Sequence, residues 1–156
     1  MTLSEKVNFL QQGLVPALNN LSRSTPARWG KMDAQQMVEH VRDAFKNASG
    51  KIIIPLITTD PERLQKMREF LMSDKPFREN TNAPFMPETP RQHKYASMEE
   101  AIAKLEPEIE DFFRAYESDP SKQVLNAVFG ELNFEQQVNL LYKHVTHHLR
   151  QFGVIL

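Results

Sequence analysis

The sequence predicts an all-α fold, a four-helix bundle with two long connecting loops, and three observations support this prediction. Four long stretches repeat apolar residues at helical spacing, whereas the signal for strands is weak. Each of these stretches begins at or near a serine, aspartate or asparagine, the residue types that cap helices. Two long segments, 73–96 and 118–130, lack this periodicity. A chain of 156 residues suffices for one domain with its own core, predicted to span 1–156.

The first predicted helix runs from about Ser4 to Leu21. Ser4 can cap its start, because a serine side chain accepts a hydrogen bond from a free backbone amide of the first turn. Gly13 and Pro16 lie inside the stretch and predict a kink or a restart of the helix. Its apolar residues recur at helical spacing: Val7, Leu10, Leu14, Leu18 and Leu21.

The second predicted helix, from Asp33 to Ala48, has clear signals at both ends. Asp33 and Gln36 form a capping-box pair at its start. Gly50 follows its last turn and favours the left-handed conformation that ends helices. Its apolar residues form one stripe: Ala34, Met37, Val38, Val41, Ala44, Phe45 and Ala48.

A short helix and two irregular segments follow. The apolar run Ile52–Ile57 contains a proline and is therefore predicted to be a buried extended connection or an edge strand. Asp60 can cap a helix that runs from Pro61 to about Met72. The segment Ser73–Ala96 is a long loop, and loops of this length in small domains often serve a function or pack on the core.

Two more long helices complete the prediction. One opens at Ser97 and continues to about Tyr116, with Pro107 expected to kink it. After a second loop over 118–130, the last helix covers Phe134–Phe152 and ends at a glycine.

The composition excludes several classes of protein. The formal net charge of −1 gives no electrostatic basis for binding nucleic acid or an anionic membrane. The chain has no cysteine, so disulfides, thiolate metal ligands and cysteine nucleophiles are excluded, and a reducing, cytoplasmic location is expected. The first residues lack the layout of a signal peptide, and no apolar run is long enough to span a bilayer.

The histidines carry the strongest chemical signal. His144 and His148 are four residues apart, so they share one face of the last predicted helix, at the edge of its apolar stripe. His40 takes a similar edge position on the second helix, whereas His147 is expected in solvent on the opposite face. Three imidazoles around one divalent ion leave a position open for water or substrate. The alternative is that each is a boundary histidine satisfied by a hydrogen bond, and His93 is expected to be a solvated loop residue.

Other polar and aromatic residues lie near these histidines in the sequence. Glu39 and Asp43 flank His40, so either could orient a ligand or act as a base. Gln137 and Gln151 lie on the same line of the last helix as His144 and His148. Trp29 is expected to pack as a hydrophobic staple or to wall a pocket.

Four segments carry a resemblance to a known family: Trp29–Met32, Gln36–His40, Phe129–Leu132 and His144–Gly153. They resemble the DinB-like superfamily of metalloenzymes over most of the chain, in particular a branch ending in H-x-x-H-H-L-R-Q-F-G whose function is unassigned. That family has one histidine on the second helix and an H-x-x-x-H pair on the last; residue by residue, these match His40, His144 and His148. The branch often carries His-Pro before its Phe-Gly, where this chain has Asn126-Ala127.

The resemblance implies a fold and an activity. The family fold is an up-down-down-up four-helix bundle, often a homodimer, and relatives bind zinc, nickel or other divalent metals. The implied reaction transfers a low-molecular-weight thiol to an electrophilic small-molecule substrate, with hydrolysis by activated water as the next candidate. Two alternatives are a metal- or ligand-binding module without turnover and a helical interaction protein whose histidines are only packed.

Overall fold

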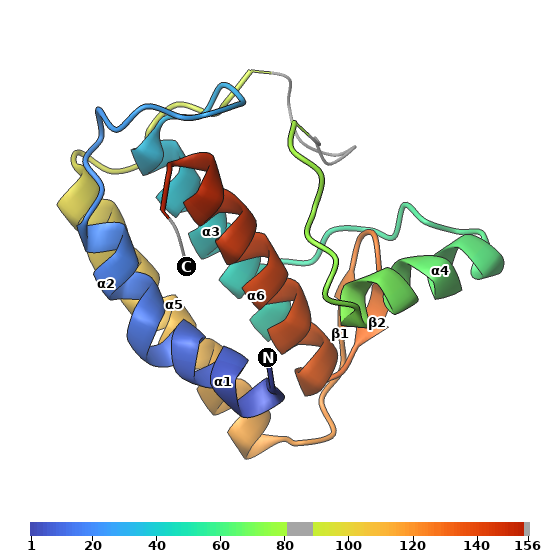
Figure 1. Ribbon diagram of the computed structural model, residues 1–156. Helices are drawn as coiled ribbons and strands as arrows, with labels where there is room; N and C mark the ends of the chain where they lie inside the picture. The colour runs from blue at the N-terminus through green and yellow to red at the C-terminus, as the bar shows by residue number, and fades with distance from the viewer. Residues whose placement is uncertain (81–88, 155–156) are drawn as a thin grey trace.

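The computed structural model describes residues 1–80 and 89–154 and shows a mostly helical chain with one two-stranded sheet (Figure 1). Within this described part, no helix has the length and apolar character needed to cross a membrane. In chain order the elements are α1 (Leu3–Asn8), the π-helical turn η1 (Phe9–Gly13), α2 (Leu14–Asn19), α3 (Ala34–Ser49), α4 (Pro61–Met72), α5 (Met98–Ser118), β1 (Val124–Asn126), β2 (Gly130–Leu132) and α6 (Phe134–Gln151).

The π-helical turn η1 interrupts the first predicted helix and separates α1 from α2. The predicted break near Gly13 takes this form, and π-helical turns insert one residue into an α-helix without ending it. The cap is not Ser4: the Thr2 side chain accepts the hydrogen bond from the Glu5 amide, at 3.1 Å. Pro16 lies in α2, three residues after this turn ends.

The capping signals locate the later helices well. Asp33 and Gln36 form the predicted capping box of α3, and Gly50 ends the helix in the left-handed region with φ of 93°. Asn133 caps α6 through a second capping box with Gln136. Helix α4 has the predicted bounds, and α5 continues two residues beyond its predicted end.

The segment 118–130, predicted to be a loop, contains most of a β-hairpin. Strands β1 and β2 pair antiparallel, with Asn126 opposite Gly130. The Asn126 side chain accepts hydrogen bonds from the backbone amides of Val128 and Phe129, at 2.9 and 3.1 Å, and so closes the turn. Strands of three residues are too short to show the apolar alternation by which strands are detected in a sequence.

The prediction of a buried connection at Ile52–Ile57 is wrong. The segment is extended but forms no strand, and the side chains of Ile53 and Ile57 are 55% and 42% exposed. A single hydrogen bond from the Ile57 amide to the Ala127 carbonyl, at 2.7 Å, joins it to the hairpin turn. Ile52, Ile54 and Leu56 are of intermediate exposure, so this segment lies at the surface of the protein.

Helix α6 is central in the arrangement of the helices. It contacts α1, α2, α3, α4 and β2, while α3 and α5 pack along each other beside it (Figure 1). The main core gathers the apolar stripes of α2, α3, α5 and α6. A second, smaller cluster formed by Leu71, Phe129 and Leu132 joins α4 to the hairpin on the other side of α6. Helix α6 is consequently buried around most of its circumference.

Candidate metal centre

Three histidine rings meet between α3 and α6. The Nε2 atom of His144 lies 2.9 Å from Nε2 of His40 and 2.9 Å from Nε2 of His148. The His40 ring stands nearly perpendicular to the other two rings, at 87° and 83°, so their edges meet rather than their faces. One nitrogen from each ring lies within 4.8 Å of those of the other two. The structure thus brings together the three residues selected from the sequence, and their role as metal ligands stays a prediction.

The donor set fits a divalent metal ion. A neutral imidazole nitrogen carries either one proton or one lone pair, so His144 Nε2 cannot make a full hydrogen bond to both neighbours. Imidazole nitrogens bind zinc at about 2.0–2.1 Å, and two nitrogens 2.9 Å apart are therefore close enough to contact one ion. Imidazole suits zinc, nickel, copper and iron alike, so the ligands do not select among these metals.

A hydrogen-bond chain through Gln151 fixes the protonation of His148. The Gln151 Nε2 group donates to the Trp29 carbonyl at 2.9 Å, and because a carbonyl only accepts, this contact sets the orientation of the amide. The Gln151 Oε1 atom then faces His148 Nδ1 at 2.7 Å, so Nδ1 carries the proton and donates it. The lone pair of His148 is left on Nε2, which points at the other two rings. Such a partner on the remote nitrogen is typical of metal-ligating histidines.

Burial keeps all three imidazoles neutral. Desolvation lowers the pKa of His40 to about 4, an effect that Asp43 opposes and Arg91 reinforces. Desolvation and the neighbouring His40 lower the pKa of His148 to about 3, and the pKa of His144 is also well below its ordinary value. His148 is buried, and the residues His40 and His144 are of intermediate exposure. Neutral rings suit the binding of a divalent ion, because only an unprotonated imidazole nitrogen can donate a lone pair to it.

The prediction that His147 lies in solvent is wrong. Its side chain is only 7% exposed, and its ring lies 5.4 Å from Trp29, 6.0 Å from Phe77 and 5.2 Å from His148, measured between ring centroids. The helical wheel assumed one buried face for this helix. The chain after α4 covers a further face, and Phe77 belongs to that segment.

His93 is also not a solvated loop residue. Its Nδ1 atom lies 2.6 Å from the Arg23 guanidinium and its Nε2 atom lies 2.6 Å from the Asp33 carboxylate. An arginine only donates, so His93 Nδ1 accepts from Arg23 and the Nε2–H group donates a hydrogen bond to the Asp33 carboxylate. His93 therefore links its own loop and the loop of Arg23 to Asp33, the capping residue of α3. These partners lie 70 and 60 residues away in the sequence, so the spacing of neighbouring residues could not predict them.

The two carboxylates that flank His40 in the sequence, Glu39 and Asp43, make no hydrogen bond to its ring in the described structure. Glu39 accepts hydrogen bonds from the backbone amides of Lys94 and Tyr95, at 2.7 and 3.3 Å, and from the Gln35 side chain at 3.0 Å. It therefore anchors the chain before α5 and is not a free base. The Asp43 side chain is 46% exposed and acts on His40 only through its charge.

Gln151 is the residue of the site that the sequence did not identify by role. Its place on the line of His144 and His148 was visible, but its partner, the Trp29 carbonyl, lies 122 residues away. Trp29 packs its ring on His147, as a wall beside the cluster. Gln137, on the same line, instead donates to the Val124 carbonyl at 3.3 Å and holds the hairpin.

Comparisons with protein-family models, with curated proteins and with solved structures found no match. A function for this chain is therefore argued from the geometry of the histidine cluster and from the resemblance in sequence.

We expect the metal-free protein to lose stability as the pH falls from about 6.5 toward 4. An unfolded histidine has a pKa of about 6.5, and the folded pKa of His40 is about 4, so the unfolded state binds more protons in this window. For His40 alone the difference corresponds to roughly 3 kcal/mol. Urea unfolding with a chelator across this pH range measures it. His40→Gln should make the dependence less steep, because His144 and His148 still contribute to it. Stability that rises as the pH falls would contradict the prediction.

We also expect the neutral His148 ring to carry its proton on Nδ1 in metal-free protein. Free imidazole side chains exchange between tautomers, but the Gln151 amide accepts only from Nδ1. Nitrogen chemical shifts of the ring at pH 7 report the tautomer directly. Gln151→Leu removes the acceptor and should produce a mixture, while Gln151→Glu keeps it. A ring protonated mainly on Nε2 in the unaltered chain would be the opposite result.

Proposed function

We propose that this chain is a metal-dependent enzyme of the DinB-like type, in which His40, His144 and His148 hold a divalent ion, zinc or nickel. The observation that supports it most directly is the convergence of three imidazole nitrogens, since the Nε2 atoms of His40 and His148 both lie 2.9 Å from that of His144. The proposal includes an up-down-down-up four-helix bundle formed by the α1–α2 segment, α3, α5 and α6. It also includes the pairing of two copies, for which the resemblance is the support.

The proposed reaction transfers a low-molecular-weight thiol to an electrophilic small molecule. Bound at the three rings, a divalent ion lowers the pKa of a thiol or water and supplies a nucleophile near neutral pH. Gln151 accepts a hydrogen bond from His148 Nδ1 and holds that ring in place. The sulfur forms a bond to the electrophilic carbon, the thiol proton passes to solvent, and the substrate gains a proton or loses its leaving group.

The same site is compatible with two other functions. An ion held by three imidazoles would activate water as well as a thiol, so hydrolysis is the second candidate. Glu39 is engaged by backbone amides and Asp43 faces solvent, so neither nearby carboxylate is placed as a general base. This arrangement favours a metal-binding module without turnover as the third candidate.

Single substitutions should identify the ligands. His40→Ala, His144→Ala and His148→Ala should each reduce zinc bound per chain at pH 7, because each removes one of three nitrogens. Elemental analysis of protein prepared without a histidine tag or nickel resin, and then reconstituted with zinc, measures this. His93→Ala is the matched control and should bind as the unaltered chain does. His147→Ala serves less well, since its ring packs on His148. Failure of the unaltered chain to bind zinc would refute the site.

A kinetic assay should separate the three candidate functions. Zinc-loaded protein, incubated with a panel of low-molecular-weight thiols and an electrophile, should form the thioether faster than the thiol alone. His144→Ala should lower this rate at least about a hundredfold, since loss of the metal removes several kcal/mol of stabilisation. Cleavage of an activated ester without thiol would instead indicate hydrolysis. If the zinc-loaded protein shows no turnover in either assay, the third candidate, a metal-binding module without turnover, is favoured.

A further inference from the structure

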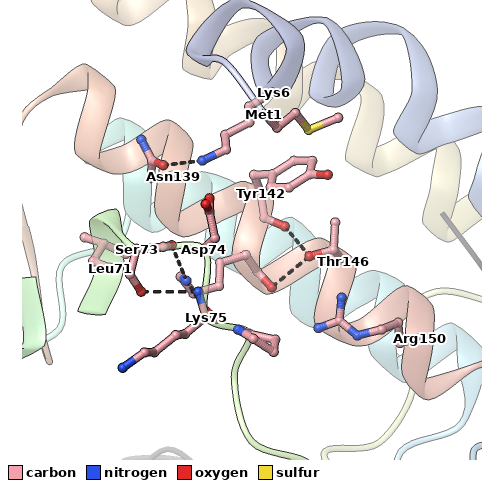
Figure 2. Close-up of a pocket in the computed structure, with 12 residues that line it drawn as sticks. Met1, Lys6, Leu71, Ser73, Asp74, Lys75, Asn139, Tyr142, Thr146 and Arg150 are labelled. Carbon is pink, nitrogen blue, oxygen red and sulfur yellow. Dashed lines mark hydrogen bonds between the residues drawn. The ribbon is translucent and has the colours of Figure 1, made fainter. Parts of the chain in front are cut away.

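A cleft of about 250 Å³ lies on the far side of α6 from the histidine cluster (Figure 2). The start of α1, the chain that follows α4 and one face of α6 line it. The lining residues of α6 recur every three or four positions, and none of them is a histidine: Asn139, Tyr142, Lys143, Thr146 and Arg150. The cleft is therefore a separate candidate site.

Positive charge dominates this cleft. Lys6, Lys75, Lys143 and Arg150 line it, against the single lining carboxylate of Asp74. The whole chain has a formal net charge of −1, so this excess is local and does not reflect a basic protein. Among the residues that the structure describes, none of these four cations takes part in an ion pair.

Lys143 is the least ordinary of these cations, because its side chain is buried. The residue is 7% exposed, and its Nζ group donates to the backbone carbonyls of Ser73, at 2.9 Å, and Lys75. The Phe70 ring lies 4.6 Å from Nζ and adds a cation–π contact. These contacts satisfy its N–H groups without a direct ion pair. Burial and, after it, nearby Lys6 lower the pKa of Lys143, and the charge of Asp74 opposes this effect. A buried ammonium that no carboxylate contacts directly costs free energy that a bound anion would offset.

Lys6 and Arg150 stand at two edges of the cleft. Lys6 Nζ donates to Asn139 Oδ1 at 2.6 Å, which holds its charge near the Tyr142 ring. Figure 2 shows the Arg150 side chain beside Thr146, on the same helix. Its charge opposes the rise that burial causes in the pKa of Tyr142. A guanidinium in this position presents a planar fork of donors that matches carboxylate and phosphate oxygens.

We propose that this cleft binds a small oxyanion, a molecule carrying a phosphoryl or carboxylate group, through Lys6, Lys143 and Arg150. Lys143 supplies a buried positive charge and Arg150 supplies directional donors. The volume of the cleft suits a ligand of a few heavy atoms rather than a nucleotide. Anion binding in this cleft needs no metal, so the proposal can be tested independently of the proposed enzyme activity.

Calorimetric titration of chelator-treated protein with inorganic phosphate and with succinate tests this. Sodium chloride keeps the ionic strength equal in both titrations, because salt screens such contacts. We expect saturable binding of at least one anion, with one site per chain. The tighter of the two identifies the phosphoryl or the carboxylate as the recognised group. The His144→Ala variant should bind equally well, which separates this site from the histidine cluster. Absence of saturable binding for both anions would overturn the proposal.

Charge variants with opposite expected effects make the test specific. Arg150→Gln and Lys6→Gln should each weaken binding at least about fivefold, the loss expected for a charge-assisted hydrogen bond. Asp74→Asn should strengthen binding, because it removes the one carboxylate that lines the cleft. Lys104→Gln, an exposed position on α5, removes the same charge elsewhere and should have no effect. Equal weakening in Lys104→Gln, or weaker binding in Asp74→Asn, would show that the cleft does not bind the anion. Lys143 is left intact, since it also holds the chain after α4.

Discussion

Helix α6 has almost no solvent face, and its polar side chains must therefore find hydrogen-bond partners inside the protein. They find them in backbone carbonyls of the surrounding segments. Gln137 donates to the hairpin, Lys143 to the chain after α4, and Gln151 to the segment before α3. One helix thereby holds three of the segments that surround it. The bond from Gln151 fixes the position of the Trp29 carbonyl. It thereby also determines which ring nitrogen of His148 carries the proton.

Desolvation lowers the pKa of ionisable side chains on both sides of α6. On the side of α3 it favours the neutral form of the imidazoles, which is the form that can donate a lone pair to a metal. On the other side it acts on Lys143, whose ammonium is held by carbonyl oxygens without a carboxylate partner. One buried helix can therefore present lone pairs to a cation in one direction and positive charge to an anion in the other.

The features predictable from the sequence were those encoded within about four residues of each other. Capping residues such as Asp33 and Ser97 located the helix starts, and the spacing of His144 and His148 placed both rings on one face. Their meeting with His40 could not follow from spacing, because 104 residues separate His40 from His144. The hairpin was not predicted, because its three-residue strands are too short to show an alternation of apolar residues. The burial of His147 was missed because a helical wheel assumes a single buried face, whereas segments on several sides cover α6.

The contact between Gln151 and the Trp29 carbonyl makes the site a property of the whole chain rather than of a portable motif. A peptide copy of α6 would carry His144, His148 and Gln151 at the right spacing. Without the Trp29 carbonyl its amide would rotate freely, and the His148 proton would be shared between both ring nitrogens. Grafting the H-x-x-x-H pair onto another helix would therefore transfer the ligands without their preorganisation. A faithful transplant would need a second segment that presents a carbonyl to the glutamine.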